Sequence, residues 1–144
     1  MVHKPFSPTL YAKNDDAKEL IIKWLNIDDE NHAYVNPDQY GIDIICDTAY
    51  EHRYFYEVEV KHNWKGAKFP FSTVHFPKRK LKFANTDSMF AMLNHERTHV
   101  LIISGQQFLN ASLVRKDTIY TKNEEFIEIT VSDCKIYELG VIHE

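Results

Sequence analysis

Residues 53–61, RYFYEVEVK, carry the pattern that most restricts how this chain can fold. Successive side chains of a β-strand point to opposite faces of the sheet, so a strand here has one apolar face and one charged face. The apolar face would carry Tyr54, Tyr56, Val58 and Val60. The other face would carry Phe55, Glu57, Glu59 and Lys61. Such a strand needs a core on one side and, on the other, either solvent or partners for its charges.

A second apolar run lies shortly before this strand. Residues 40–47, YGIDIICD, are predicted to form a mostly buried strand that contains one acid, Asp43. Residues 49–52, AYEH, supply a turn, so the two runs are expected to pair as a hairpin. Burying a carboxylate in an apolar strand costs free energy unless the group is paired or binds a metal. Asp43 is therefore a candidate functional residue.

The remaining elements predict an α+β or mixed α/β domain. Residues 14–26, NDDAKELIIKWLN, are predicted to form a helix capped by Asn14 or Asp15. Further strands are expected at 89–93, 98–104 and 124–131, and residues 62–83 are expected to be irregular and then briefly helical after Pro77. The apolar stripe of the helix would consist of Ala17, Leu20, Ile21, Trp24 and Leu25.

Length and composition fit one globular domain, residues 1–144, with 44% hydrophobic and 26% charged residues. The N-terminus lacks the apolar centre of a signal peptide, and no apolar run approaches the roughly 20 residues of a membrane span. Cys46 and Cys134 fit no zinc or redox spacing. Cys46 is expected to be a buried thiol, and the cytoplasm is the expected location.

Charge is unevenly distributed along the chain. The net charge is −4, but no acid lies between Glu59 and Asp87, a stretch that holds seven of the 17 basic residues. Aromatic residues alternate with these cations, and cations neutralise phosphates while aromatic rings stack on bases. We therefore expect DNA binding by Lys65, Lys68, Lys78, Arg79 and Lys80. Alternatively, the aromatic residues, Phe71 and Phe76 in particular, belong to the core and the lysines form a solvated rim.

Three residues of the hairpin are predicted to form a catalytic site: Asp43, Glu59 and Lys61. Alternate strand positions are about 6.5–7 Å apart, so these side chains can converge in front of the sheet. Two carboxylates suit Mg²⁺ or Mn²⁺, with the Val60 carbonyl as a further ligand, and such an ion polarises a phosphate and activates water. Lys61 would orient that water or stabilise the transition state. Glu57 is expected to face solvent or to support the site without binding the ion.

At these residues the chain resembles the PD-(D/E)XK nuclease superfamily. That family pairs an Asp on one strand with a (D/E)-X-K tripeptide on the next, after an N-terminal helix. Here Asp43 in GIDII and Glu59-Val60-Lys61 match, although Ile42 stands where the name gives Pro. The resemblance covers residues 14–104 loosely.

The resemblance implies a restriction-endonuclease-like fold, a mixed central sheet flanked by helices, and a Mg²⁺-dependent deoxyribonuclease. It also implies DNA as the partner, a homodimer if both strands are cut, and small phage-encoded members as the most similar type, which would act in the host cytoplasm. An acid of the first helix often joins the site in this family. Glu19 matches by position but points away from the apolar stripe, and Asp16 lies nearer its edge, so this role stays open.

Two other functions compete with cleavage. A module that binds nucleic acid without cutting could keep the same fold and lysines. Residues 95–99, HERTH, match the H-E-x-x-H pattern of zinc proteases, in which His95, Glu96 and His99 would share one helix. The β-forming run after them predicts a turn instead, with His95 exposed.

Overall fold

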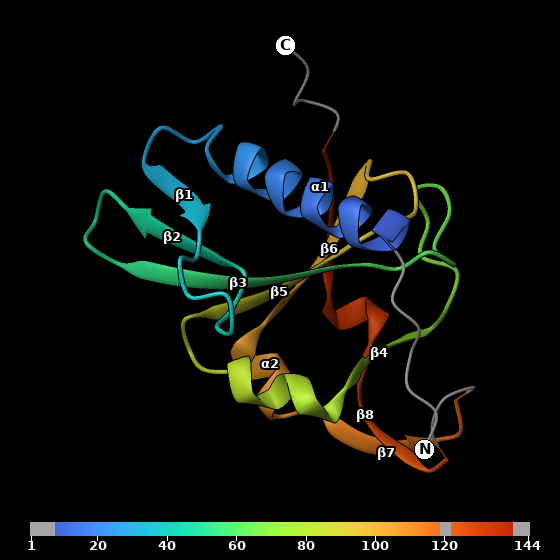
Figure 1. The fold of residues 1–144 in the computed structure, drawn as a ribbon. Helices are drawn as coiled ribbons and strands as arrows, with labels where there is room; N and C mark the ends of the chain where they lie inside the picture. Colours follow the sequence, from blue (N-terminus) through green and yellow to red (C-terminus); the bar gives the residue numbers. More distant parts are fainter. Residues whose placement is uncertain (1–7, 119–121, 140–144) are drawn as a thin grey trace.

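Two β-sheets make up most of the fold (Figure 1). The structure is a computed structural model that describes residues 8–118 and 122–139. The larger sheet has six strands in the order β1-β2-β3-β5-β6-β9, and the smaller has three in the order β4-β8-β7. With helices packed against the larger sheet, the fold is α+β, as the sequence predicts.

The six-stranded sheet is mixed. Its strands are β1 (Asn31–Val35), β2 (Ile44–Thr48), β3 (Arg53–Val60), β5 (Ser88–Leu93), β6 (His99–Ser104) and β9 (Lys135–Glu138). β3 and β5 run parallel, whereas the other neighbouring pairs are antiparallel. The predicted hairpin is confirmed, since β2 pairs with β3 and places Ile44 opposite Tyr56. Parallel neighbours need a crossover, and residues 61–87 provide it.

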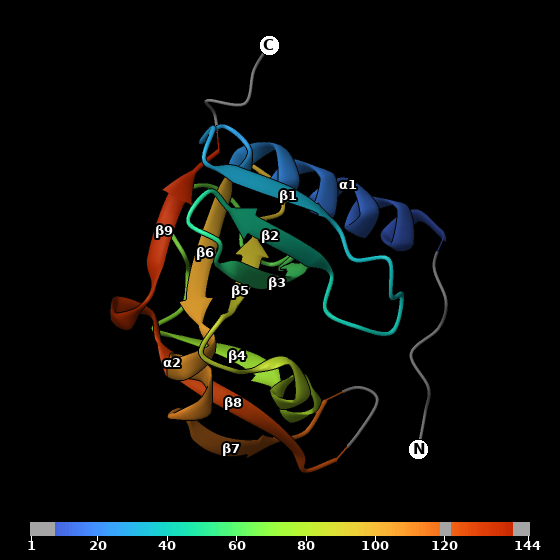
Figure 2. The same ribbon diagram turned by 90° about the vertical axis from the view of Figure 1, so that its left-hand side faces the viewer.

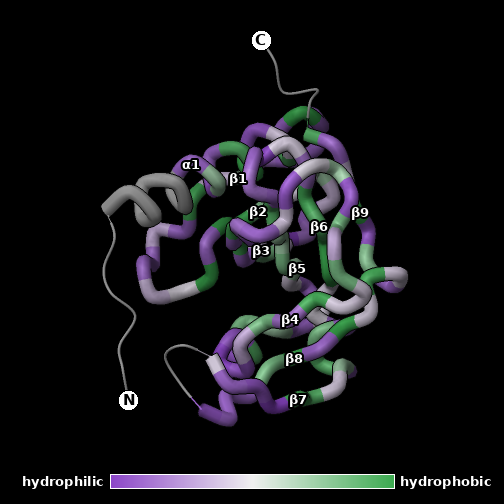
Figure 3. Tube along the Cα trace, turned by 90° about the vertical axis from the view of Figure 1, so that its right-hand side faces the viewer, coloured by the Kyte–Doolittle hydropathy of each residue, from purple (hydrophilic) through white to green (hydrophobic). Residues whose placement is uncertain are grey.

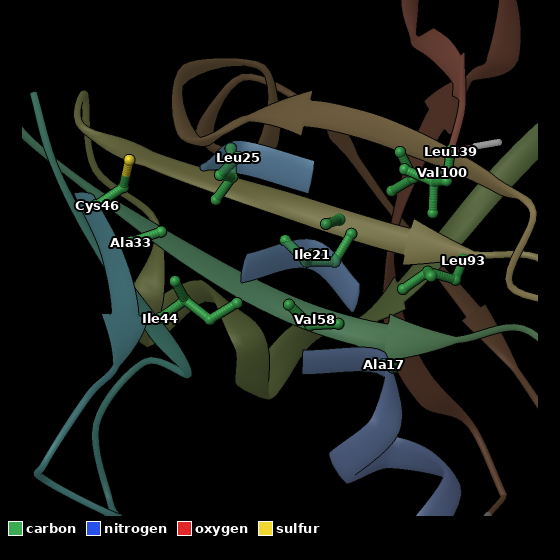
Figure 4. Packing of buried hydrophobic residues seen from close by; sticks show 11 residues of the cluster. Ala17, Ile21, Leu25, Ala33, Ile44, Cys46, Val58, Leu93, Val100 and Leu139 are labelled. Atoms are coloured by element: carbon green, nitrogen blue, oxygen red, sulfur yellow. The ribbon is translucent and has the colours of Figure 1, made fainter. Parts of the chain in front are cut away.

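Helix α1 (Pro8–Leu25) covers one face of this sheet (Figures 1 and 2). Ala17, Ile21 and Leu25 point from the helix onto the sheet, where they meet residues of β2, β3, β5 and β6 (Figure 4). The even-numbered residues of β3 belong to this core, including Val58 and the partly buried Val60. The odd-numbered residues of β3 therefore face the opposite side, where the charged residues lie.

A second core lies on that opposite side, between the two sheets (Figure 2). It is closed by β4 (Thr73–Pro77), β8 (Glu124–Thr130), β7 (Ser112–Lys116), α2 (Gly105–Leu109) and the 3₁₀ helices η1 (Lys78–Phe83) and η2 (Val131–Asp133). The rings of Phe90 and Phe108 stack with centroids 4.0 Å apart, and Phe76 packs against both. Hydrophobic residues consequently run along central strands such as β6 (Figure 3).

Several predicted boundaries were wrong. α1 begins at Pro8, so the predicted cap at Asn14 or Asp15 lies inside the helix. Proline suits a first helical position because its missing N–H has no helical acceptor there. β2 begins at Ile44, one residue after Asp43. The segment predicted to be irregular contains β4, whereas its short helix after Pro77 is confirmed as η1.

In residues 8–118 and 122–139, no helix combines the length and the apolar character needed to span a bilayer.

Candidate active site

Asp43 lies in a bend immediately before β2, where it links three parts of the chain. Its Oδ2 accepts a hydrogen bond of 2.9 Å from the main-chain N–H of Val58 in β3. Its Oδ1 lies 3.2 Å from Nζ of Lys18 in α1, and the Asp43 side chain is 18% exposed. Asp43 thus reaches the charged face of β3 from the neighbouring strand, as the hairpin predicts.

Glu57 is the acid that faces Asp43. The pairing of β2 with β3 ends at Ile44 and Tyr56, and Asp43 and Glu57 are the next residues beyond that pair, where their carboxyl groups interact. The Glu57 side chain is 8% exposed, and its Oε2 lies 2.5 Å from Nζ of Lys80 in η1. Its Oε1 is buried and has no hydrogen-bond partner among the described residues. The expectation that Glu57 faces solvent was therefore wrong, because η1 covers this part of β3.

Burial and the neighbouring Asp43 carboxylate raise the pKa of Glu57 to about 7. Both causes disfavour a charged Glu57, whereas the Lys80 ammonium opposes them. A carboxyl group with this pKa is partly protonated at neutral pH and would lose its proton to a bound cation. Perturbed acids of this kind occur frequently at functional sites.

Glu59 and Lys61 follow Glu57 on the same face. Lys61 lies just past the end of β3, and its main-chain N–H donates to the Leu93 carbonyl at 2.9 Å. Burial and the nearby Lys116 lower the pKa of Lys61, and the Glu59 carboxylate partly offsets this effect. Lys61 thus interacts electrostatically with Glu59, as the E-x-K pattern predicts. Val60, the predicted carbonyl ligand, is the last residue of β3.

Lys61 also lines a cavity of about 470 Å³ beyond the end of β3. Its Nζ lies 5.5 Å from the ring centroid of Phe71, which forms part of the wall. The site therefore consists of an acidic part around Asp43 and Glu57 and a basic part around Lys61. Glu59 lies between the two parts in the sequence of β3.

The two acids of α1 considered for this site, Asp16 and Glu19, lie on the surface of the helix. Both are exposed, and the expected direction of Glu19 is confirmed. Lys18, between them, is the helix residue that reaches the site, through Asp43. The first helix thus contributes a cation where the resemblance implies an acid.

The cations of the basic segment differ in their surroundings. Lys78 and Arg79 form ion pairs with Glu125 and Glu124 of β8, at 3.1 and 3.7 Å, and Lys80 pairs with Glu57. Lys65 and Lys68 are exposed in the loop after β3. The pairing of β4 with β8 places Glu124 and Glu125 next to Arg79 and Lys78, which are distant from them in the sequence. Lys65 and Lys68 are therefore the better candidates for phosphate contacts.

The aromatic residues of the same segment are mostly core. Trp64, Phe69 and Phe76 are buried, which confirms Phe76 as a core residue. Phe71 is 45% exposed, so its predicted place in the core was wrong. It is the aromatic ring of this segment that remains accessible beside Lys61.

Replacing both Lys65 and Lys68 with Ala should weaken DNA binding and lower the slope of log K against log salt. Two lost contacts with duplex phosphates correspond to a change of up to about 1.8. The matched variant Lys78→Ala/Arg79→Ala should change the slope less, since Glu124 and Glu125 already neutralise these cations. Salt titrations of fluorescently labelled duplex DNA measure both slopes. Equal changes would contradict this assignment.

The HERTH segment is a turn followed by a strand. Residues 95–98 form the turn, Arg97 has a φ of 60°, and His99 begins β6. The buried Asn94 side chain fixes the turn by accepting hydrogen bonds from the N–H groups of Thr98 and His99. The predicted turn is confirmed, and the helical spacing that a zinc protease needs is missing here. The prediction that His95 is exposed was wrong, because this half-buried ring packs edge-on against His62.

Within the described residues, no three carboxylate, imidazole or thiol side chains form a group that could hold a metal ion. An ion at this site would therefore depend on two carboxylates, main-chain oxygen, water and substrate. Mg²⁺ commonly binds in this way, with one or two carboxylates and several waters.

Sequence reasoning missed Lys18. It expected Glu57 to face solvent or support the site without binding the ion, and it assigned Lys80 to DNA binding instead of to Glu57. The predicted turn at 49–52 does not give the observed register, because β2 and β3 pair Asp47 with Arg53 and leave five residues, 48–52, between them. The two lysines come from α1 and η1, and no local pattern reports such distant contacts. No family model, curated protein or solved structure matches this chain.

Proposed function

We propose that this protein is a metal-dependent deoxyribonuclease with its active site on the β2–β3 hairpin. The observation that carries the proposal is the contact between Asp43 and the buried Glu57, next to Glu59 and Lys61 on the same strand. Two carboxylates brought together in this way repel each other unless a proton or a cation lies between them. A nuclease site uses such an arrangement to hold a divalent ion beside a phosphate.

The arrangement of elements supports the restriction-endonuclease-like fold as part of this proposal. An N-terminal helix packs on a mixed sheet, Asp43 precedes one strand, and the E-x-K tripeptide ends the next. These are the features that the PD-(D/E)XK resemblance implies. One face of the six-stranded sheet differs from the arrangement that the resemblance implies. The small sheet, with α2 and η1, covers this face, where further helices are expected.

The acidic residues fit Mg²⁺ or Mn²⁺. The Glu57 Oε1 is a buried oxygen with no geometric hydrogen-bond partner among the described residues, beside Asp43, where a cation would replace the proton that Glu57 and Asp43 otherwise share. Asp43 would hold the ion together with one of the β3 acids, Glu57 or Glu59, and with the Val60 carbonyl. The bound ion would supply Lewis-acid activation of the phosphodiester and of water.

The residues of this chain would have separate roles in cleavage. Lys61 would orient the attacking water or donate hydrogen bonds to the negative charge that develops on the phosphate. Lys18 would hold Asp43 in place through its ion pair. Lys65 and Lys68 would bind phosphates of the DNA outside the reacting group.

A second candidate is a module that binds nucleic acid without cutting it. The observation that favours it is that Lys18 and Lys80 already neutralise Asp43 and Glu57 within the chain. In that case the carboxylates are partners in ion pairs, one partly exposed and one around the buried Glu57, and need no metal. Both candidates predict DNA binding, and they differ only in metal binding and cleavage.

The experiment that separates them is a cleavage assay on duplex, branched and single-stranded DNA with Mg²⁺, Mn²⁺ or EDTA. The nuclease should cut at least one substrate with either metal and none in EDTA. Binding of the same substrates, measured in EDTA, provides the reference for affinity. Binding without cleavage under every condition would favour the non-cutting module. The absence of both binding and cleavage would contradict both candidates.

A further inference from the structure

The cavity beyond β3 has a built set of cationic and polar groups. Its walls come from the end of β3, the loop before β4, β4 itself and the end of β7. The residues that line it are Lys61, Asn63, Pro70, Phe71, Ser72, Thr73, His75 and Lys116. These described lining residues include two ammonium groups, an imidazole, an amide and two hydroxyls, and no carboxylate.

Resting on the proposed nuclease function, we propose that this cavity binds a second phosphate group of the DNA strand that is cleaved, beyond the reacting phosphate. Lys61 and Lys116 would supply the charge, and Asn63, Ser72 and Thr73 would supply neutral hydrogen-bond donors. The cavity would position the strand so that the reacting phosphate meets Asp43 and the β3 acids.

Lys116 is held in place by a chain of contacts across the small sheet. Its Nζ lies 3.3 Å from Nδ1 of His75, and Nε2 of His75 lies 2.8 Å from Oε2 of Glu128. An ionised carboxylate only accepts hydrogen bonds, so Nε2 donates to Glu128. In the neutral imidazole, Nδ1 is then an acceptor and bonds the Lys116 ammonium. The cation therefore points to a defined place before any ligand arrives.

Aromatic rings support both ammonium groups. Lys116 Nζ lies 5.5 Å from the centroid of Phe126, and Lys61 Nζ lies at the same distance from Phe71. Such cation–π contacts hold a lysine without neutralising its charge. The two cations line the same cavity and repel each other. An anion between them would relieve this repulsion, so the cavity favours a phosphate over a neutral ligand.

The position of the cavity matches a path along β3. Lys61 follows Glu57 by four residues, which places their Cα atoms about 13 Å apart along an extended strand. A nucleic-acid strand that crosses the acidic pair can therefore reach the cavity with a second phosphate. The exposed ring of Phe71 at the rim offers a surface on which a base can stack. The acidic part and the basic part would thus bind successive parts of one substrate.

The test compares Lys116→Ala with the control Lys135→Ala, which removes the same charge from an exposed position on β9. DNA binding is measured in EDTA, so that the result does not depend on cleavage. Lys116→Ala should lower the slope of log K against log salt by about 0.9 on duplex DNA or about 0.7 on single strands. Lys116→Arg should restore the slope, and Lys135→Ala should leave it unchanged.

Competition with inorganic phosphate distinguishes the source of the anion. If the cavity accepts a phosphate only as part of DNA, millimolar phosphate should leave the difference between wild type and Lys116→Ala intact at constant ionic strength. A cavity for free phosphate would instead show displacement of DNA from wild type alone, which would overturn the assignment to the strand. An unchanged slope in Lys116→Ala would also overturn the assignment, even if the wild-type protein cuts DNA.

The two proposals can fail separately. If the wild-type protein never cuts DNA but Lys116→Ala still lowers the slope, the nuclease proposal is removed and a DNA-phosphate site in this cavity remains.

Discussion

Asp43→Asn should reduce the rate of DNA cleavage by about a thousandfold, since the divalent ion that provides several kcal/mol of transition-state stabilisation loses a carboxylate ligand. Glu59→Gln and Glu57→Gln, compared under the same conditions, identify which β3 acid supplies the second carboxylate. The acid that binds the ion should show a loss similar to that of Asp43→Asn. Single-turnover cleavage of labelled DNA measures all three rates.

Metal dependence provides the control for this prediction. Higher Mn²⁺ should partly rescue a variant that lacks one carboxylate, because the remaining ligands still bind the ion at higher concentration. Lys61→Ala should lose about 10² to 10³ in rate and should not be rescued, because its role is toward the water or the developing charge. An Asp43→Asn protein that melts normally and cuts DNA as fast as wild type would contradict the assignment of this acid.

Lys80→Ala should destabilise the fold by about 3 kcal/mol at pH 8, because breaking a buried ion pair leaves Glu57 without its cation. The effect should shrink toward pH 5, where Glu57 is protonated in the folded protein and needs no partner. The double variant Lys80→Ala/Glu57→Gln should recover most of the loss. Lys78→Ala, which breaks the exposed pair with Glu125, should cost less than about 1 kcal/mol. Urea unfolding at several pH values measures these differences.

The sign of the pH dependence follows from Glu57. Its pKa of about 7 in the folded protein exceeds the ordinary value of 4.5, so the folded state binds more protons between these values. The contribution of this group to stability is therefore fully present below pH 4.5 and is lost as the pH rises through 7. Glu57→Gln should remove that part of the pH dependence. An unchanged pH profile in Glu57→Gln would contradict the assignment of a buried, protonated Glu57.

Local patterns predicted the central hairpin and the two following strands of the large sheet correctly. Alternation over residues 53–61 and the apolar runs at 89–93 and 98–104 reflect burial, and each of these strands lies inside the sheet. β1, β7 and β9 lie at sheet edges and are only four or five residues long. Short edge strands bury fewer residues, so their patterns are weak and were missed.

The charge distribution shows why a site is harder to predict than a fold. Residues 60–86 contain no acid, which suggested a free basic surface. In the fold, Glu57, Glu124 and Glu125 lie against Lys80, Arg79 and Lys78. The pairs of Lys78 and Arg79 depend on β4 pairing with β8, some 50 residues further along the chain, whereas Lys80 meets Glu57 of the preceding strand β3. Separation of charge in a sequence therefore does not establish its separation in space.

The resemblance selected Asp43 and the E-x-K tripeptide from the sequence, but the register decides how they meet. One residue of difference in the β2–β3 pairing would have turned Asp43 to the other face of the sheet. The observed pairing ends at Ile44 and Tyr56, and beyond it the Asp43 carboxylate interacts with Glu57 and accepts a hydrogen bond from the N–H of Val58, the residue between Glu57 and Glu59. The pattern thus identified Asp43 and Glu59, whereas the interaction of Asp43 with Glu57 required the structure.

The most direct test of the central claim is the position of Mn²⁺ in a crystal of the wild-type protein soaked in that ion. The account predicts an anomalous-scattering peak bound by Asp43 and by Glu57 or Glu59, with Lys80 displaced from Glu57 if Glu57 is the ligand. A peak at this position would support a divalent site on the hairpin. No peak there, with Lys18 and Lys80 still paired to the two acids, would contradict it and leave the hairpin as a buried ion-pair network.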